Sequence, residues 1–412
     1  MGIELMQKNL VVIGLGYVGL PLVINAANSG FNVYGFDTSE SKIKELKSGN
    51  QMIESLNTES LREHYLSKKI RFTSNIEDVP GDSIFVIAVP TPLDNLGKPD
   101  LSYLELACKS ISKVISPGSL VISESTSYIG TLRNFIRKNI DELSNVEDIH
   151  YGVAPERIDP GNETWNLKNT PRIISGLTDV AIEGTLNFYK NFCTEVIVVT
   201  SPEVAEASKL LENTFRLVNI ALINEFSNLT RKLGLNTFEI TSAAATKPFG
   251  FMQFLPGIGV GGHCIPIDPI YLMHSAREVE IDLEMVGLAN DINLSAHKSV
   301  INKLENLLGS DLKGKKIQIV GISYKINIAD TRESPVPKFI SELEFRGATV
   351  TWHDPLVKKF NGQLSTPLSL DIDLGLLVNP HDCIDLNIWK QNGVKVFDVS
   401  SNKANHGWSK IL

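Results

Sequence analysis

The chain has 412 residues, of which 42% are hydrophobic and 21% charged, and its formal net charge is −8. This length exceeds what one hydrophobic core usually supports, so we expect an ordinary globular protein of two or three domains. The acidic balance argues against a nucleic-acid-binding protein, which normally carries a basic face. No apolar run approaches the roughly 20 residues of a membrane span. No export signal precedes the first strand, so we expect a cytoplasmic protein that binds no membrane.

The first predicted unit is a strand, a glycine-rich turn, a helix and a second strand. Gly14, Gly16 and Gly19 form the pattern G-x-G-x-x-G directly after the apolar run 10–13, and Asp37 follows 18 residues beyond Gly19. In this order the pattern indicates dinucleotide binding, with the pyrophosphate at the helix N-terminus. An acid at the end of the second strand binds the adenosine ribose and repels a 2′-phosphate, so we expect NAD rather than NADP. A glycine-rich turn without a ligand is the alternative.

Further strand and helix units follow up to about residue 200. The runs "SIFVIAVP", "SLVISES", "HYGVAPERIDPG" and "EVIVVT" are predicted strands whose polar residues, such as Thr91, 124–126 and Glu156, lie where the strands stop. Ligands bind outside the carboxyl ends of the strands in an open parallel sheet. We therefore expect an NAD-binding domain at 1–200, with these polar residues on the cofactor side.

A long helix is predicted from Pro202 to Leu233, with Ser201 as its N-cap. Lys209 and Asn213 are four residues apart in it, so they share one face. A helix of this length is a natural dimer element, and we expect a homodimer through it. A second helical stretch at 284–308 completes a central helical region, 201–309.

The α/β pattern then resumes in a smaller domain at 310–412. "KKIQIVGISY", "TVTWHDP", "LGLLVN" and "VKVFDVS" read as strands, and a helix precedes Gly347, but no G-x-G-x-x-G occurs there. The predicted fold class is α/β, with two doubly wound Rossmann-type domains joined by a long central helix and helical region.

One cysteine stands in an unusual loop, "LPGIGVGGHCIPIDPIYL". Cys264 follows four glycines and precedes two prolines, whereas a thiol used only for packing does not need this setting. A buried cysteine beside a turn is the alternative. The other cysteines, Cys108, Cys193 and Cys383, show no metal-ligand or disulfide spacing, so we expect reduced thiols and no metal.

The chain as a whole resembles the nucleotide-sugar 6-dehydrogenases, the UDP-glucose/GDP-mannose dehydrogenase family. The resemblance lies in "GLGYVGLPL", "VPTPLD", "SESTSYIGT", "APERIDPG", "EASKLLENTFRLVNIALINE", "PGIGVGGHCIPIDPIYL" and "GISYKINIADTRESP". These segments occur in the family's order over essentially the whole chain. The resemblance implies a four-electron oxidation of the sugar C6 alcohol to a carboxylate, with two NAD molecules reduced. It also implies that the C-terminal domain holds the UDP part of a UDP-sugar.

The resemblance assigns the catalytic residues. Cys264 matches the nucleophile, whose thiolate adds to the C6 aldehyde as a thiohemiacetal that loses hydride to give a thioester. Lys209 and Asn213 match the donors that stabilise the oxyanion at C6. Asp268 matches an aspartate that works with a water in proton transfer. The other catalytic positions are Thr126, near the nicotinamide, and Glu156, associated with thioester hydrolysis.

The same resemblance assigns the binding residues. The positions expected to contact NAD are Gly14, Gly16, Tyr17, Val18, Gly19, Asp37, Lys42, Thr91, Ser125 and Arg332. The positions expected to contact the substrate are Glu156, Arg157, Lys209, Asn213, Lys247, Gly261 and Lys325. Of these, Lys247 could equally be an ordinary solvated lysine.

Three residues separate the branches of the family. Pro160 stands where the UDP-glucose enzymes carry a second carboxylate, and Arg157 and His263 also resemble the N-acetylhexosamine branch. We therefore expect UDP-GlcNAc or UDP-ManNAc as the substrate, with UDP-GlcNAc narrowly ahead. A UDP-glucose 6-dehydrogenase is the alternative within the class. A two-electron hydroxy-acid dehydrogenase has no use for Cys264, and a non-catalytic nucleotide-sugar binding protein would not need the catalytic residues that are present.

Overall fold

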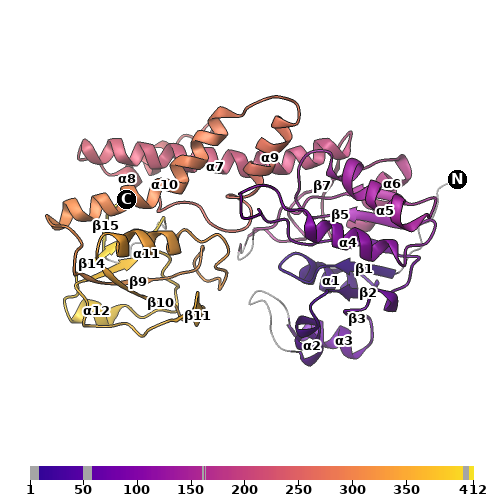
Figure 1. The fold of residues 1–412 in the computed structure, drawn as a ribbon, viewed down its shortest axis with the longest axis horizontal. Coiled ribbons are helices and arrows are strands. Elements are labelled where there is room, and N and C mark those ends of the chain that lie inside the picture. The colour runs from indigo at the N-terminus through magenta and orange to yellow at the C-terminus, as the bar shows by residue number, and fades with distance from the viewer. Residues whose placement is uncertain (1–8, 50–57, 160–161, 163, 402–407) are drawn as a thin grey trace. The chain divides into compact units, whose positions relative to one another are not determined.

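The computed structural model describes residues 9–49, 58–159, 162, 164–401 and 408–412 (Figure 1). The chain forms two compact units. Unit 1 comprises residues 1–212 and 270–280, and unit 2 comprises 213–269 and 281–412. Each unit is described by itself below. None of the helices within the described ranges is long and apolar enough to cross a membrane.

Unit 1 is built on an eight-stranded sheet with the order β3-β2-β1-β4-β5-β6-β7-β8. Its strands are β1 (Asn9–Ile13), β2 (Asn32–Phe36), β3 (Ile70–Thr73), β4 (Ile84–Ile87), β5 (Leu120–Ser123), β6 (His150–Val153), β7 (Arg172–Gly176) and β8 (Val196–Val198). The chain order reverses between β1 and β4, which is the switch point of a doubly wound sheet. All neighbours are parallel except β6 and β7, which are antiparallel, so the sheet departs from the purely parallel one predicted.

Helices cover both faces of this sheet (Figure 1). Leu10 and Val12 of β1 belong to one hydrophobic core and Val11 and Ile13 to the other, because successive side chains of a strand point to opposite faces. The helices are α1 (Gly19–Asn28), α2 (Glu40–Ser48), α3 (Thr58–Leu66), α4 (Ser102–Ser112), a π-helix (Leu132–Arg137), α5 (Lys138–Ser144) and α6 (Asp179–Tyr189). Both faces being buried explains why the central strands read as continuous apolar runs.

Unit 2 contains a five-stranded parallel sheet with the order β10-β9-β13-β14-β15. Its strands are β9 (Lys316–Val320), β10 (Thr349–His353), β13 (Leu374–Leu377), β14 (Val396–Asp398) and β15 (Ser409–Lys410), and a small pair is formed by β11 (Lys359–Phe360) and β12 (Gln363–Leu364). The helices α10 (Glu284–Leu308) and α11 (Val336–Phe345) share one core with the sheet, and α12 (Asn387–Gln391) packs on a second core through Trp389.

Three further helices complete the middle of the chain: α7 (Pro202–Lys232), α8 (Thr237–Ala244) and α9 (Asp268–Arg277). The long helices α7 and α10 were both predicted with closely similar bounds. Together with the two sheets they confirm the predicted α/β fold class.

The turns after β1 and β9 are built alike, although only the first carries the glycine pattern. The N–H of Gly14 donates to Phe36 O, and that of Gly321 donates to His353 O, at 2.9 Å in each case. Both glycines have positive φ, at 97° and 87°. The residue after each glycine donates its N–H to an aspartate: Leu15 to Asp37 at 3.1 Å and Ile322 to Asp354 at 2.9 Å. The second sheet therefore repeats the local geometry of the first.

Candidate functional site

The glycine turn of unit 1 brings backbone close to backbone at two of its three glycines. A Cβ on Gly14 would lie 2.6 Å from Ala88 O, and one on Gly19 would lie 1.9 Å from Gly14 O. A Cβ on Gly16 would meet nothing within 4 Å. Gly14 and Gly19 are therefore needed by the protein itself, whereas the space beside Gly16, at the N-terminus of α1, is open for a ligand. Tyr17 and Val18 lie in the same turn.

Asp37 and Lys42, predicted separately as cofactor contacts, form one ion pair. Asp37 Oδ2 lies 2.6 Å from Lys42 Nζ and accepts the N–H of Leu15 at 3.1 Å. Asp37 Oδ1 accepts the N–H of Ser39 at 3.0 Å. The carboxylate is only 9% exposed, so these contacts fix its orientation at the end of β2.

Three other predicted residues meet where β4 and β5 end. Thr91 Oγ1 donates to the carbonyl of Thr126 at 2.6 Å, and Ser125 Oγ donates to the carbonyl of Val89 at 2.8 Å. The hydroxyl hydrogens of Thr91 and Ser125 are therefore both donated to backbone carbonyls. These side chains can offer a ligand only acceptor oxygens, while they hold the segment around Thr126 in place.

Glu156, at the end of β6, is held by three donors. Its Oε2 accepts from Arg172 Nη2 at 2.7 Å, and its Oε1 accepts the N–H groups of Arg157 and Ile158 at 2.7 and 2.6 Å. The side chain of Arg157 turns away and pairs with Glu212 of α7 at 2.7 Å. Pro160, the residue that the branch assignment depends on most, lies outside the described residues.

Sequence reasoning missed the partners of Glu156. Arg172 of β7 is 3% exposed and also lies 3.7 Å from Glu124 Oε1, which accepts the hydroxyl of Tyr189. Burial raises the pKa of Glu124 to about 7. The charge of Arg172 lowers this pKa, and the charge of Glu156 raises it. One guanidinium therefore serves two buried carboxyl groups. A buried acid at the end of a strand, Glu124 in "SES", was a signal that a buried cation should lie nearby. Nothing in the local sequence identified that cation as Arg172.

The first half of α7 carries a buried acid and a buried ammonium. Glu206 accepts the N–H groups of Gly130 and Leu132 at 2.5 and 2.9 Å, which caps the start of the π-helix, and burial raises its pKa to about 7. Lys209, one turn further, is 8% exposed and forms no hydrogen bond or ion pair within the described part of the chain. A buried ammonium without a protein partner is costly, which is what a cation reserved for a ligand would show.

In unit 2 the predicted residues Cys264, Asp268 and Asn213 are joined by hydrogen bonds. The Cys264 carbonyl accepts the N–H of Asp268 at 2.9 Å and that of Ile267 at 3.2 Å, and this turn leads into α9. Asn213 Nδ2 donates to Asp268 Oδ2 at 2.6 Å, with both side chains buried. Cys264 itself is exposed. The thiol therefore sits at the start of a helix whose first residue is fixed to α7.

The glycines before Cys264 are needed for packing inside unit 2. A Cβ on Gly261 would lie 2.8 Å from Tyr324 Cβ, and one on Gly262 would lie 2.8 Å from the ring of the same tyrosine. Gly262 has φ +83° and donates its N–H to Arg332 O at 3.1 Å. The cysteine loop thus lies directly against the segments that follow β9.

Next to the cysteine, His263 is held neutral: burial and then the charge of Arg332 lower its pKa to about 4, against the opposing pull of Asp330. Arg332 pairs with Asp330 at 2.6 Å, and Lys325 is partly buried. Lys247 is exposed, with Nζ 4.8 Å from the ring centroid of Phe249, as an ordinary surface lysine would be.

Comparison with known proteins gives matches over most of the chain. Family models of the UDP-glucose/GDP-mannose dehydrogenase family match as the NAD binding domain at 8–193, the central domain at 203–295 and the UDP binding domain at 318–387. The chain is 38% identical over 355 residues to a UDP-N-acetyl-D-mannosamine dehydrogenase of Pyrococcus horikoshii, covering 85% of this chain and 84% of the relative.

A second relative and a solved structure are also similar to this chain over most of its length. A UDP-N-acetyl-D-glucosamine 6-dehydrogenase of Pseudomonas aeruginosa is 34% identical over 355 residues, covering 84% of this chain and 83% of the relative. The solved structure of a UDP-D-ManNAc dehydrogenase from Pyrococcus horikoshii is similar with a TM-score of 0.87 and 32% identity, covering 98% of this chain and 99% of that one.

The glycine turn gives a matched pair of variants. Gly19→Ala should lower the free energy of unfolding by about 1–3 kcal/mol, because its Cβ would overlap Gly14 O. Gly16→Ala should leave thermal unfolding nearly unchanged but weaken NAD binding, because its Cβ enters open space beside the helix N-terminus. Calorimetric unfolding and NAD titration of both variants check this. Equal loss of stability in the two variants would contradict the assignment.

Proposed function

Because the chain belongs to the UDP-glucose/GDP-mannose dehydrogenase family and is a nucleotide-sugar 6-dehydrogenase with an NAD binding domain, we propose that it oxidises the C6 hydroxyl of a UDP-N-acetylhexosamine to the uronic acid. The observation that carries the proposal is the exposed Cys264 with Asp268 and Asn213 hydrogen-bonded beside it. A single two-electron oxidation would not need a nucleophile, whereas an aldehyde has to gain one before it can give up a second hydride.

The proposed reaction has two oxidations and one hydrolysis. NAD accepts a hydride from C6 in each oxidation. Between them the Cys264 thiolate adds to the aldehyde carbon, and the thiohemiacetal loses its hydride to become a thioester. Water then adds to the thioester carbonyl and the thiolate leaves, so one sugar yields one carboxylate and two NADH.

The roles of the neighbouring residues follow from how they are held. Asp268 fixes the Asn213 amide, so this donor needs no reorganisation when negative charge develops at C6. Lys209 supplies an ammonium that no described side chain neutralises. Glu156 keeps one orientation because Arg172 and two backbone N–H groups hold it. We assign Glu156 to placing the substrate and the hydrolytic water.

The choice of sugar rests on the relatives and on the sequence near Glu156. Relatives at 38% and 34% identity are named for the mannosamine and glucosamine substrates, which supports a 2-acetamido sugar. The sequence favoured UDP-GlcNAc narrowly, and we now rank UDP-ManNAc first because the relative named for it is the more similar of these two. Arg157 and His263, which resemble this branch in the sequence, lie beside Glu156 and Cys264 respectively. A pocket built for an amide leaves polar groups unpaired when plain glucose binds, so UDP-glucose should react poorly.

Removing the thiol tests the covalent route. Cys264→Ala should abolish formation of the uronic acid, measured by mass spectrometry, while NAD and UDP binding remain close to wild type. Cys264→Ser should accumulate a slowly hydrolysed ester, visible as added mass on the protein. Cys383→Ala is the matched control, since Cys383 is also exposed and has no assigned role. Acid formation by Cys264→Ala at a wild-type rate would exclude the mechanism.

A substrate panel tests the sugar. The purified protein is incubated with NAD and, separately, UDP-ManNAc, UDP-GlcNAc, UDP-GalNAc, UDP-glucose and GDP-mannose, and NADH is counted per sugar consumed. We expect two NADH per sugar and the highest kcat/KM for UDP-ManNAc or UDP-GlcNAc. UDP-glucose as the best substrate would refute the branch assignment alone. One NADH with release of the aldehyde would refute the thioester route.

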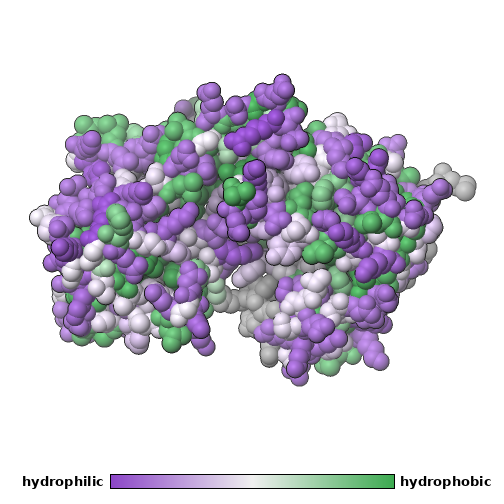
Figure 2. Space-filling view, viewed as in Figure 1, coloured by the Kyte–Doolittle hydropathy of each residue, from purple (hydrophilic) through white to green (hydrophobic). Residues whose placement is uncertain are grey.

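We also propose a homodimer through α7. Leu222 and Leu229, seven residues apart on this helix, are 61% and 54% exposed, and Leu288 of α10 is 63% exposed. Figure 2 shows apolar residues at the surface along the edge where α7 and α8 lie. Leucines at this spacing form an apolar stripe on one helix face, which soluble proteins usually cover.

The dimer is tested by charging this stripe. The double variant Leu222→Glu, Leu229→Glu should halve the mass measured by light scattering after size exclusion, because two carboxylates per chain would have to be buried. Leu364→Glu is the control, since Leu364 is 67% exposed on β12. A wild-type monomer, or an unchanged mass in the double variant, would contradict the assignment.

A further inference from the structure

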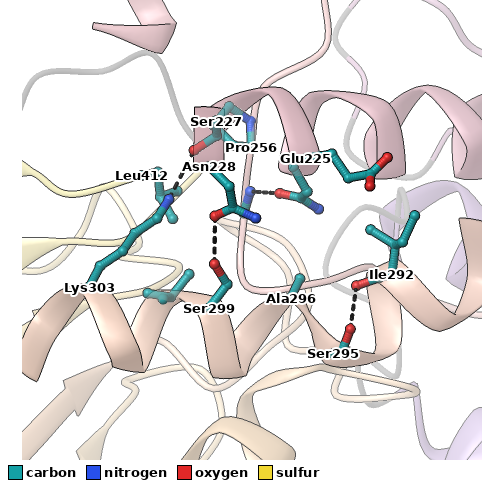
Figure 3. Close-up of a pocket in the computed structure, with 13 residues that line it drawn as sticks. Glu225, Ser227, Asn228, Pro256, Ile292, Ser295, Ala296, Ser299, Lys303 and Leu412 are labelled. Carbon is teal, nitrogen blue, oxygen red and sulfur yellow. Dashed lines mark hydrogen bonds between the residues drawn. The ribbon is translucent and has the colours of Figure 1, made fainter. Parts of the chain in front are cut away.

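Two cavities of unit 2 meet at one buried lysine. The smaller, of about 200 Å³, lies between α7 and α10 (Figure 3). The larger, of about 560 Å³, lies among the end of α7, α8, α10 and β15. Lys303 of α10 lines both cavities. None of the residues lining the larger cavity has a role in the proposed reaction.

Lys303 lies inside the protein and forms no ion pair with a carboxylate of the described residues. It is 3% exposed, and its Nζ donates to Ser227 Oγ at 2.9 Å across the gap between the two helices (Figure 3). That hydroxyl is its one hydrogen-bond partner within the described ranges. Burial, followed by the positive charge of Arg231, lowers the pKa of Lys303 to about 8. A buried cation beside a second cation is unfavourable unless an anion joins them.

The larger cavity, which we call the Lys303 cavity, carries an excess of positive charge. Arg231, Lys303 and Lys410 line it, and no acidic residue is among its described lining residues. Lys410 is compensated, because its Nζ lies 3.3 Å from Asp398 Oδ2 behind the wall. Arg231 forms no ion pair within the described part of the chain. Leu412, the last described residue, also lines the cavity, but its carboxylate forms no ion pair with Arg231 or Lys303, so these two cations have no ion-pair partner among the described residues.

The side chains that line the Lys303 cavity indicate the chemistry of a ligand that would fit it. Phe238 and Phe397 line the cavity together with Leu235 and Leu307, so its walls combine apolar and cationic side chains, and Lys410 Nζ lies 4.6 Å from the centroid of the Phe238 ring. The volume falls within the range of about 300–1,000 Å³ typical of small-molecule sites and is larger than an inorganic oxyanion needs. The donors suit a dianion, and the aromatic side chains suit a group attached to it.

We propose that the Lys303 cavity binds an organic phosphate, with the phosphate between Lys303 and Arg231 and its apolar part against Phe238 and Phe397. This site is additional to those for NAD and the UDP-sugar. Ser227, which lines the smaller cavity, uses one of the three N–H groups of the Lys303 ammonium, so two N–H groups remain for the phosphate. The phosphate would pair with these two cations, neither of which forms an ion pair with a described residue.

Binding should depend on pH through Lys303. The ammonium loses its proton as the pH rises through about 8, so affinity should be highest near pH 7 and fall by pH 9. The other charged groups around the cavity are Arg231 of α7, the pair of Lys410 and Asp398, and the carboxylate of Leu412, and Glu225 lines the smaller cavity. Arginine stays charged over this range, so a fall in affinity reports Lys303.

The experiment measures binding of phenyl phosphate to the full-length protein by calorimetry, at constant ionic strength with NAD and UDP saturating. We expect saturable binding that is tighter than for inorganic phosphate, absent for phenol, and weaker at pH 9 than at pH 7 by up to about 10-fold, the loss that a pKa near 8 allows. Saturating NAD and UDP keeps the probe out of the other phosphate sites. No saturable binding, or phenol binding equally well, would overturn the proposal.

Three variants locate the site. Arg231→Gln and Lys303→Met should each weaken phenyl phosphate binding at least 10-fold, and Arg231 is exposed, so its variant should fold even if Lys303→Met does not. Lys232→Gln is the control, because Lys232 is the exposed neighbour of Arg231 and does not line the cavity. Unchanged affinity in Arg231→Gln, or an equal loss in Lys232→Gln, would refute the site.

Discussion

The fold depends on close backbone contacts that a side chain would block. A Cβ on Gly19 would lie 1.9 Å from Gly14 O, and one on Gly321 would lie 2.0 Å from Asn379 O. These two contacts let the chain turn tightly at the carboxyl end of the first strand of each sheet. The same constraint governs the cysteine loop, where Gly261 and Gly262 pack on Tyr324. In all three segments, to which we assign ligand contacts, the absence of a side chain on glycine allows the close packing.

Much of the fold was predictable because it follows local rules. Apolar runs predicted the central strands, and caps with helical periodicity predicted α7 and α10. The strand β7 (Arg172–Gly176) was not among the predicted strands, and its direction was not predictable because a short strand has the same residue pattern whichever way it runs. The residues that pack against the cysteine loop were also not predictable from the sequence. Tyr324 and Pro335 lie far along the chain from Gly261, and no local pattern links them to it.

The candidate site was predictable where the chemistry lies in a motif. The glycine pattern, Asp37 and the loop of Cys264 could be named from spacing or resemblance. What could not be named was how the side chains are held: Arg172 with Glu156, Tyr189 with Glu124, and the two backbone donors of Glu206. These contacts join strands and helices that are distant in sequence. Buried charges need partners, but no local rule says which partner the fold provides.

The distance along the chain between paired strands has a consequence for the order in which the sheet of unit 1 forms. Arg172 of β7 pairs with Val196 of β8 across one helix, α6, and Leu10 of β1 pairs with Val33 of β2 across one helix, α1. In the centre of the sheet, by contrast, Leu10 pairs with Ile84, so a much longer piece of chain has to close first. Closing a shorter loop costs less chain entropy. The β1–α1–β2 and β7–α6–β8 segments are thus the parts of unit 1 best suited to form early, and the pairing of β1 with β4 is the contact that forms late.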